Sequence, residues 1–149
     1  MKLIERIHLL SRPDKLKPAR DSLRKLAIAQ GCSPENIDCL IMAINEACMN
    51  IMQHAYNGDE NGEIILEFFR DDDVLIIRIH DFAEKVDKAS IKSRDLDDIR
   101  PGGLGVHFIH QVMDEVDYKD RPGEQGNTLE MRKKIGDVKN CSIDCKGGL

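Results

Sequence analysis

Hydrophobic and polar residues alternate along this chain with two periods, one typical of helices and one of strands. Apolar residues spaced three and four positions apart predict helices, and runs rich in β-branched residues between turn residues predict strands. In chain order, the predicted elements are a strand over Ile4–Leu10, helices over Lys15–Gln30 and Ser33–Tyr56, strands over Gly62–Arg70 and Val74–Asp81, a helix over Val106–Met113, and strands over Glu115–Lys119 and Thr128–Lys134. This order predicts an α+β fold, a two-layer sandwich of helices on a mostly antiparallel sheet.

Breaker residues mark the ends of the helices. Gly31 stops the first helix, and Ser33-Pro34 opens the second, with the serine as N-cap. Asn57-Gly58 ends that second helix. The segment Phe82–Arg100 is polar and weakly periodic, which predicts a mobile loop with one helical turn.

Length and composition describe an ordinary globular protein. The 149 residues predict one domain over residues 1–136, followed by a loosely ordered tail over 137–149. Hydrophobic residues make up 41% of the chain and charged residues 33%, which is typical of globular domains. The net charge is -5 and no basic block occurs, so we expect no direct binding to nucleic acid.

Targeting signals and cysteine usage predict a cellular compartment. No apolar run is long enough for a signal peptide or a membrane span, so we expect a cytoplasmic protein that does not bind membranes. The five cysteines are an odd number without regular spacing, which predicts reduced thiols. Cys141 and Cys145 lie four residues apart in the tail, where no Cys/His cluster supplies further metal ligands, and their role stays open.

A polar stripe accompanies the core face of the second helix. Glu46, Asn50 and His54 follow one another at four-residue steps, so in a helix they lie on one side. The small residues Ala43 and Ala47 lie beside this stripe and leave room for a ligand near the backbone. A carboxylate, an amide and an imidazole on one side of a helix predict a binding site lined by these polar groups, although a solvated helix face would show the same stripe.

Three later features could complete such a site. Asp81 ends a strand, where its carboxylate can accept a hydrogen bond from the amino group of a base or simply cap a turn. Gly102-Gly103-Leu104-Gly105 leads into a helix, an arrangement that favours an anion but also occurs as a flexible turn. Gly126-Asn127-Thr128 enters the last strand and brings a hydroxyl to its start. The glycine loop matches neither a P-loop nor a dinucleotide-binding fingerprint.

Taken in order, these motifs resemble the GHKL nucleotide-binding fold. They are Glu46-x-x-x-Asn50-x-x-x-His54-Ala55, the strand-ending Asp81, Gly102-Gly103-Leu104-Gly105 and Gly126-Asn127-Thr128. The superfamily includes gyrase-type ATPases and histidine kinases. The short chain and the run Gly103-Leu104-Gly105-Val106-His107 look most like its bacterial anti-sigma-factor serine kinase branch. The resemblance covers about residues 4 to 135.

The resemblance implies a role for each matching residue. Glu46 would be the general base that deprotonates an attacking serine, and Asn50 would coordinate Mg²⁺ on the nucleotide phosphates. Asp81 would bind the adenine amino group of ATP, with Thr128 near the adenine. The phosphates would be held by the glycine loop and the start of its helix, Gly103, Leu104, Gly105 and Val106. Residues from Ala83 to Arg100 would form a lid over ATP, and His54 would fix helix packing.

One residue departs from the family pattern. The family usually has Asp-x-Gly at the adenine site, whereas this chain reads Asp81-Phe82-Ala83. If the turn needs a positive φ, Ala83 costs about 1–2 kcal/mol in strain. A methyl group against the base would also clash. We therefore expect either weakened ATP affinity or a differently shaped loop.

The resemblance implies an ATP-dependent serine/threonine kinase that is also an anti-sigma regulatory factor. Its substrate would be a small anti-anti-sigma-type protein, its second partner a sigma factor or an analogous regulator, and its assembly a homodimer. The alternative is a catalytically weak or inactive binding module with the same fold, which Ala83 favours and Glu46 and Asn50 oppose. A histidine kinase domain is a weaker hypothesis, since no histidine lies on a separate dimerisation helix.

Overall fold

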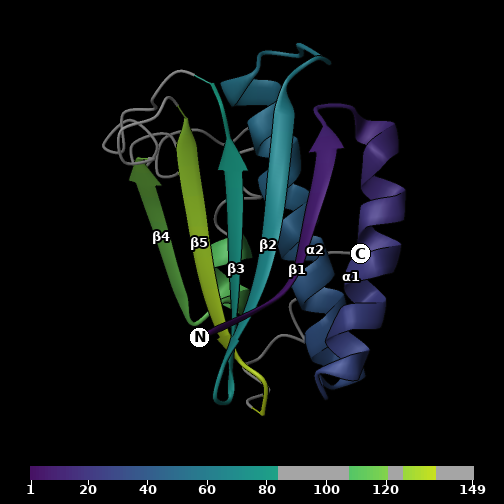
Figure 1. Cartoon of the computed structure of the whole chain (residues 1–149), viewed down its shortest axis with the longest axis vertical. Helices are drawn as coiled ribbons and strands as arrows, with labels where there is room; N and C mark the ends of the chain where they lie inside the picture. Colours follow the sequence, from purple (N-terminus) through teal and green to yellow (C-terminus); the bar gives the residue numbers. More distant parts are fainter. Residues whose placement is uncertain (84–107, 121–125, 137–149) are drawn as a thin grey trace.

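The computed structural model describes residues 1–83, 108–120 and 126–136 (Figure 1). Its elements in chain order are β1 (Lys2–Leu10), the 3₁₀ turn η1 (Pro13–Lys15), α1 (Leu16–Ala29), α2 (Pro34–Asn50), the π-helix η2 (Ile51–Ala55), β2 (Glu63–Asp71), β3 (Val74–Asp81), β4 (Glu115–Asp120) and β5 (Asn127–Lys134). Residues 108–112 are also helical, which agrees with the helix predicted there. The predicted mobile loop from residue 84 onward and the predicted tail lie outside the described residues.

The described strands form one sheet in the order β1-β2-β3-β5-β4, and every neighbouring pair is antiparallel. Helices α1 and α2 cover one face of this sheet (Figure 1). The predicted two-layer α+β fold is therefore confirmed. β3 is the central strand, and it ends at Asp81 at the same end of the molecule as the C-terminal end of α2 (Figure 1).

The core lies between the helices and the sheet. Successive side chains of a strand point to opposite faces, so Leu75, Ile77 and Ile79 of β3 all point toward the helices, where each is at most 1% exposed. Ile44 and Cys48 of α2 belong to the same cluster. Each such aliphatic side chain contributes roughly 1.5–3 kcal/mol by leaving water, so this layer fixes how α2 lies on β3.

The helix ends follow the predicted breakers. The Ser33 hydroxyl accepts a hydrogen bond from the Asn36 N–H at 3.2 Å, so Ser33 is the N-cap of α2. Gly31 has φ +86, a left-handed conformation that glycine adopts without a steric penalty, and it follows the end of α1.

The second helix does not continue as an α-helix to Tyr56, so that part of the prediction was wrong. α2 ends at Asn50, and Ile51–Ala55 form a π-helix in which the Tyr56 N–H donates to Ile51 O at 2.9 Å. The extra residue in the turn moves His54 off the regular four-residue stripe, and His54 is exposed. The spacing of residues was interpreted with the α-helical period. It could therefore not indicate that the backbone hydrogen bonds change from an i→i−4 to an i→i−5 pattern.

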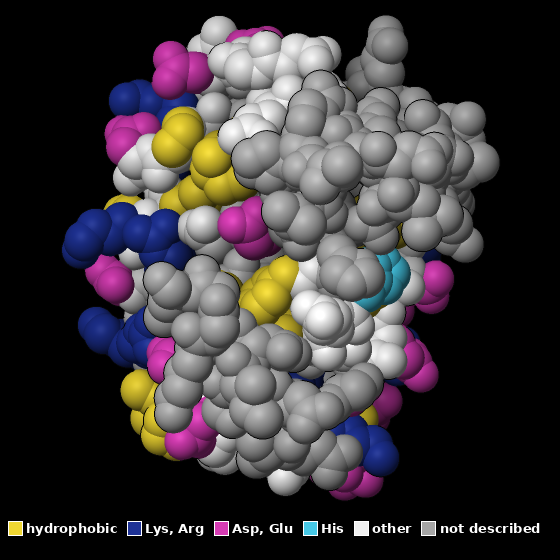
Figure 2. Space-filling view, turned by 180° about the vertical axis from the view of Figure 1, so that it is seen from behind, with side chains coloured by type: hydrophobic (Ala, Val, Ile, Leu, Met, Phe, Trp, Pro, Cys, Tyr) yellow, Lys and Arg dark blue, Asp and Glu magenta, His cyan; other side chains and the backbone are white. Residues whose placement is uncertain are grey.

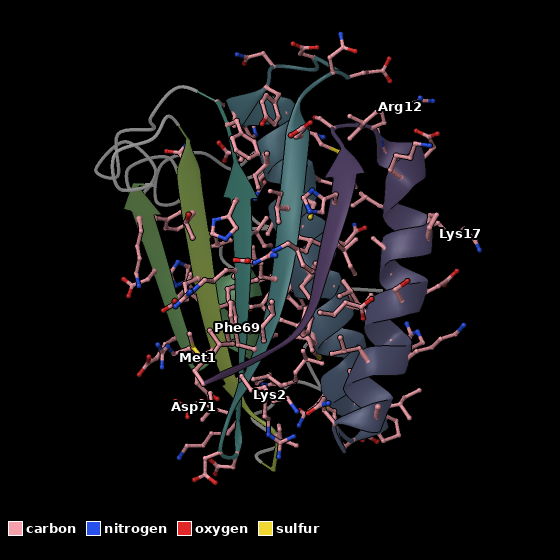
Figure 3. All side chains as sticks on the ribbon, viewed as in Figure 1. Met1, Lys2, Arg12, Lys17, Phe69 and Asp71 are labelled. Carbon is pink, nitrogen blue, oxygen red and sulfur yellow. The ribbon has the colours of Figure 1, made fainter. Side chains whose placement is uncertain are left out.

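The sheet face opposite the helices carries paired charges (Figure 3). Glu67 accepts hydrogen bonds from Arg6 at 2.7 and 2.9 Å. Glu130 accepts one from Arg78 at 2.8 Å and lies 3.3 Å from Lys119 Nζ. At one end of this face the N-terminal amino group of Met1 lies 3.9 Å from Asp71, and Figure 3 labels both residues. We call the Glu67 and Glu130 pairs the outer-face network.

The helix layer has a charged outer surface. Figure 2 shows Lys and Arg side chains among Asp and Glu along the margin of this side of the molecule. Lys17 pairs with Asp21 at 3.5 Å, and Arg24 pairs with Asp38 at 2.9 Å. Within the described ranges, no helix combines the length and apolar character of a membrane span.

The prediction of reduced cysteines is correct for two of the described residues, because Cys32 and Cys48 are free. Cys39 is fully buried in the core. Cys141 and Cys145 lie outside the described residues.

Candidate functional site

The polar stripe of α2 lies at its C-terminal end. Glu46 and Asn50 are half-buried, while the adjacent Ala47 and Cys48 are at most 2% exposed and pack in the core. Neither Glu46 nor Asn50 has a hydrogen-bond or ion-pair partner among the residues that the structure describes. The fold thus holds the helix backbone firmly while both polar groups stay available.

Burial acts on the Glu46 carboxyl without a counter-charge. It raises the pKa of Glu46, and no other cause contributes. A carboxylate in a poorly hydrated place binds a proton more readily than one in water. The environment of Glu46 is therefore suited to taking up a proton, which is the task of a general base.

Asp81 is a second carboxylate on this side of the sheet, and it is buried, with 4% exposure. Its Oδ1 accepts hydrogen bonds from Asn127 Nδ2 at 3.0 Å and from the Ala83 N–H at 3.1 Å. Burial raises the pKa of Asp81, and these donors offset that rise only in part. The result is a carboxylate with a fixed orientation at the end of β3.

Thr128 does not lie beside Asp81. Residues Asp81 and Asn127 are directly paired across β3 and β5, and the next pair is His80 with Thr128. Because successive side chains point to opposite faces, the Thr128 hydroxyl lies on the outer face, 2.7 Å from His80 Nδ1. Asn127 lies beside Asp81 and binds it, a contact that residue spacing did not identify. Once strand register is assumed, the alternation along Asn127-Thr128 is the signal that could have identified Asn127.

The strain considered for Ala83 is not present. The described non-glycine residues with positive φ are Asn57 and Asp72, so Ala83 has an ordinary backbone conformation. Its N–H contributes to fixing the Asp81 carboxylate, and the residue is buried. Alanine in place of the usual glycine therefore carries no conformational cost here.

Tyr56 is a site residue that residue spacing did not identify. Its hydroxyl accepts a hydrogen bond from the Phe82 N–H and donates one to Glu63 O, both at 2.7 Å. Phe82 follows Asp81 directly, and Tyr56 follows the π-helix that continues from Asn50. One side chain thus connects the end of the Glu46 helix to the strand end that carries Asp81.

Other predicted features fall outside this part of the chain. The glycine-loop residues Gly103, Leu104, Gly105 and Val106 and the segment predicted as a lid after Ala83 are outside the described residues. Across the described ranges, no group of three or more His, Cys, Asp or Glu side chains is arranged to hold a metal ion.

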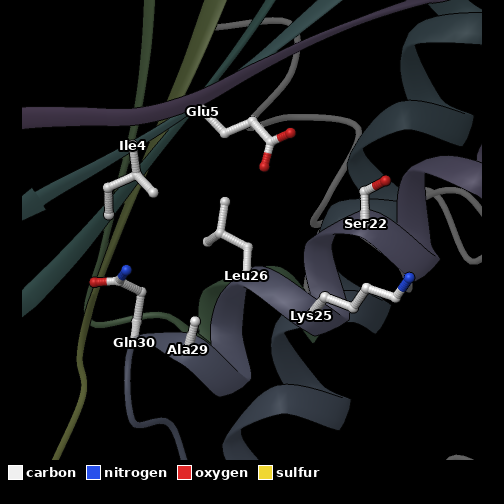
Figure 4. Close-up of a pocket in the computed structure, with 7 residues that line it drawn as sticks. All are labelled: Ile4, Glu5, Ser22, Lys25, Leu26, Ala29 and Gln30. Atoms are coloured by element: carbon white, nitrogen blue, oxygen red, sulfur yellow. The ribbon is translucent and has the colours of Figure 1, made fainter.

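An open hollow lies elsewhere, between edge strand β1 and α1 (Figure 4). Its volume is about 380 Å³, and it is lined by Ile4, Glu5, Ser22, Lys25, Leu26, Ala29 and Gln30. It shares no residue with the group around Glu46 and Asp81.

Known proteins share both the sequence and the fold. Residues 9–133 match the family model described as the histidine kinase-like ATPase domain. The chain is 32% identical over 140 residues to the serine-protein kinase RsbW of Listeria monocytogenes serovar 1/2a, covering 88% of this chain and 87% of that protein. It is 31% identical to the serine-protein kinase RsbW of Bacillus subtilis strain 168, covering 76% of each.

Two solved structures have the same fold at lower identity. The crystal structure of the SiaB–SiaC complex from Pseudomonas aeruginosa matches with a TM-score of 0.62 and 16% identity, over 90% of this chain and 91% of that one. The crystal structure of the RsbU and RsbW domains of a Mycobacterium tuberculosis protein matches with a TM-score of 0.62 and 17% identity, over 89% of this chain and 33% of that one. This chain belongs to the histidine kinase-like ATPase family, in the group of RsbW serine-protein kinases.

Proposed function

We propose that this chain is an ATP-dependent serine/threonine protein kinase and anti-sigma regulatory factor that phosphorylates a small anti-anti-sigma-type protein and sequesters a partner. The observation that carries this proposal is the group formed by Glu46, Asn50 and Asp81. The first two are half-buried and without partners among the described residues, and the third is a fixed carboxylate at the same end of the fold. A general base, a metal ligand and a base-recognising acceptor are what phosphoryl transfer from ATP requires.

Glu46 acts as the general base in this proposal. It takes the proton of the attacking serine hydroxyl, and the burial that raises its pKa favours that uptake. Asp81 accepts a hydrogen bond from the adenine amino group, with its carboxylate held by Asn127 and Ala83. Thr128 is proposed to lie near the adenine, as the family resemblance implies, and its hydroxyl contacts His80 on the strand that carries Asp81.

Asn50 is the residue proposed to hold Mg²⁺ together with the nucleotide phosphates. An amide oxygen without a partner among the described residues fits a hard cation, and the Glu46 carboxylate lies one helical turn away. The ion supplies neutralisation of charge on the phosphates when it is bound. Gly103, Leu104, Gly105 and Val106 are proposed to bind the phosphates through their backbone N–H groups, as the family resemblance implies.

The relatives support an anti-anti-sigma-type partner, and the family resemblance implies the others. Proteins at about 31–32% identity are named serine-protein kinases, and a chain of similar fold was solved in the SiaB–SiaC complex. We infer a homodimer in the cytoplasm that alternates between a sigma factor or analogous regulator and an anti-anti-sigma-type substrate. Binding and phosphorylation would then compete for one kinase molecule.

Calorimetry of ATP binding with Mg²⁺ tests this proposal. Wild type should bind, and Asn50→Ala should lose the Mg²⁺-dependent part of the affinity, about tenfold or more for a lost metal ligand. Asn61→Ala is the matched control, because it removes an amide from an exposed loop position. If the wild-type protein does not bind ATP in the presence of Mg²⁺, the kinase proposal is wrong and a nucleotide-free binding module remains.

A further inference from the structure

Tyr56 makes two hydrogen bonds that join separate segments of backbone. Its hydroxyl accepts from the Phe82 N–H and donates to Glu63 O, each at 2.7 Å. A phenolic hydroxyl has one proton and free lone pairs, so both bonds can exist at once. The start of β2 and the residue after β3 are therefore held to one side chain.

The π-helix determines where this side chain stands. Only Ile51–Ala55 separate Tyr56 from Asn50, and the Tyr56 N–H closes the π turn on Ile51 O at 2.9 Å. The additional residue in that turn rotates Tyr56 relative to its position in an uninterrupted α-helix. The hydroxyl is thus rigidly connected to the helix that presents Glu46 and Asn50.

Gly62 fixes the position of the ring. A Cβ atom at Gly62 would lie 2.7 Å from Cδ1, Cδ2 and Cε1 of Tyr56, which is closer than non-bonded atoms allow. The ring therefore packs directly on the glycine backbone, next to Glu63, whose carbonyl it binds. A side chain at residue 62 would displace the ring, so glycine is required by this contact and not by its φ angle.

The other end of the connection is the turn that carries Asp81. Phe82, whose N–H binds Tyr56, lies between Asp81 and Ala83, and the Ala83 N–H binds the Asp81 carboxylate. We propose that Tyr56 is a positioning residue that sets Asp81 at a fixed place relative to Glu46 and Asn50, and so controls recognition of the nucleotide base. This inference rests on the proposed function, and it adds a residue to which no role in the reaction has been assigned.

Tyr56→Phe tests this role because it removes the hydroxyl and keeps the ring. Binding of ATP and of ITP, each with Mg²⁺, is measured by calorimetry and competition. ITP lacks the amino group whose hydrogen bond Asp81 is proposed to accept. We expect ATP affinity to fall about tenfold, since the two hydrogen bonds of the Tyr56 hydroxyl are lost. ITP affinity should change less than twofold, so the preference for ATP over ITP should shrink.

Two further variants separate positioning from a general loss of fold. Gly62→Ala should reduce the ATP preference in the same way by displacing the ring. Tyr118→Phe removes the other tyrosine hydroxyl of the chain, on β4, and should leave both affinities unchanged. Exchange of the Phe82 amide hydrogen should become faster in Tyr56→Phe, which reports the lost bond directly.

The outcomes distinguish this inference from the function on which it depends. If wild type binds ATP and Tyr56→Phe binds ATP and ITP with unchanged or equally reduced affinity, the positioning role is wrong and the kinase proposal stands. If wild type binds neither nucleotide, both are wrong.

Discussion

The pKa values of carboxylates on the two sides of the sheet are shifted in opposite directions. On the outer face, burial alone would raise the pKa of Glu67, but hydrogen bonds from His80 and Arg6 outweigh it and the pKa is lowered. On the helix side, burial raises the pKa of Glu46 without any opposing cause. Glu67 is 9% exposed and Glu46 is half-buried, so burial alone does not explain the lower pKa of Glu67; the difference comes from their partners.

The same contrast separates Glu130 from Asp81. Glu130 is 4% exposed, and Arg78 and Lys119 overcome its burial, so its pKa is lowered. Asp81 is equally buried, but its partners are the neutral Asn127 amide and backbone N–H groups, and its pKa is raised. Full charge pairing on the outer face contributes to folding, whereas incomplete pairing on the helix side leaves carboxylates available to a ligand.

Glu46→Gln should produce the largest effect. The amide cannot accept the serine proton, so phosphate transfer to an anti-anti-sigma-type protein should fall about 10²–10⁴-fold. Binding of ATP with Mg²⁺ should persist, because Asn50 and Asp81 are intact. The measurement is phosphate incorporation from labelled ATP, with Glu35→Gln, at an exposed position of α2, as control. Retention of full transfer by Glu46→Gln would remove Glu46 from the role of general base.

Asp81→Asn should lower ATP affinity without lowering the stability of the fold. The amide presents an N–H where the adenine amino group needs a stronger acceptor, so ATP affinity should fall about 10–100-fold. The free energy of unfolding should not decrease. The folded pKa is raised above the unfolded one, so the ionised Asp81 disfavours folding at neutral pH, and asparagine removes this charge.

Urea titrations and ATP calorimetry on the same samples check the Asp81→Asn prediction. Val74→Thr is a control on the same strand, at its other end. A variant that loses ATP binding only because it is unfolded would contradict the contrast between the faces.

Glu67→Gln, on the outer face, should lower stability and leave ATP affinity nearly unchanged. Arg6 and His80 lose a charged partner, which costs about 1–2 kcal/mol after allowance for the partly exposed arginine, while ATP affinity stays within twofold. The pKa of Glu67 is lowered in the folded state. Its contribution is therefore complete above the ordinary value of 4.5 and is lost as the pH falls through the folded pKa.

Denaturant titrations between pH 7 and pH 3 measure this difference. The stability gap between wild type and Glu67→Gln should close at the acid end. A gap that is independent of pH would mean that Glu67 stabilises the sheet by packing and not by charge.

How much the sequence could predict depends on the range of the interaction concerned. The run Val74–Asp81 and the cap at Ser33 depend on neighbouring residues, and β3 and the start of α2 were predicted within one residue. Glu46 and Asn50 share a helix side for the same local reason. The π-helix depends on a local change of backbone hydrogen-bond register, and the position of Asn127 beside Asp81 depends on pairing between distant strands. The spacing of residues along the chain indicates neither.

Ala83→Gly should have the smallest effect, and it tests the residue that departs from the family pattern. The N–H that binds Asp81 is retained, and the φ of Ala83 needs no glycine, so ATP affinity should change less than twofold. Stability should fall by about 0.4–1 kcal/mol, because glycine has more conformational freedom to lose on folding. ATP calorimetry and urea titration together check both parts. Much tighter ATP binding by the variant would mean that the Ala83 methyl obstructs the base, and it would favour a binding module with weakened catalysis over an efficient kinase.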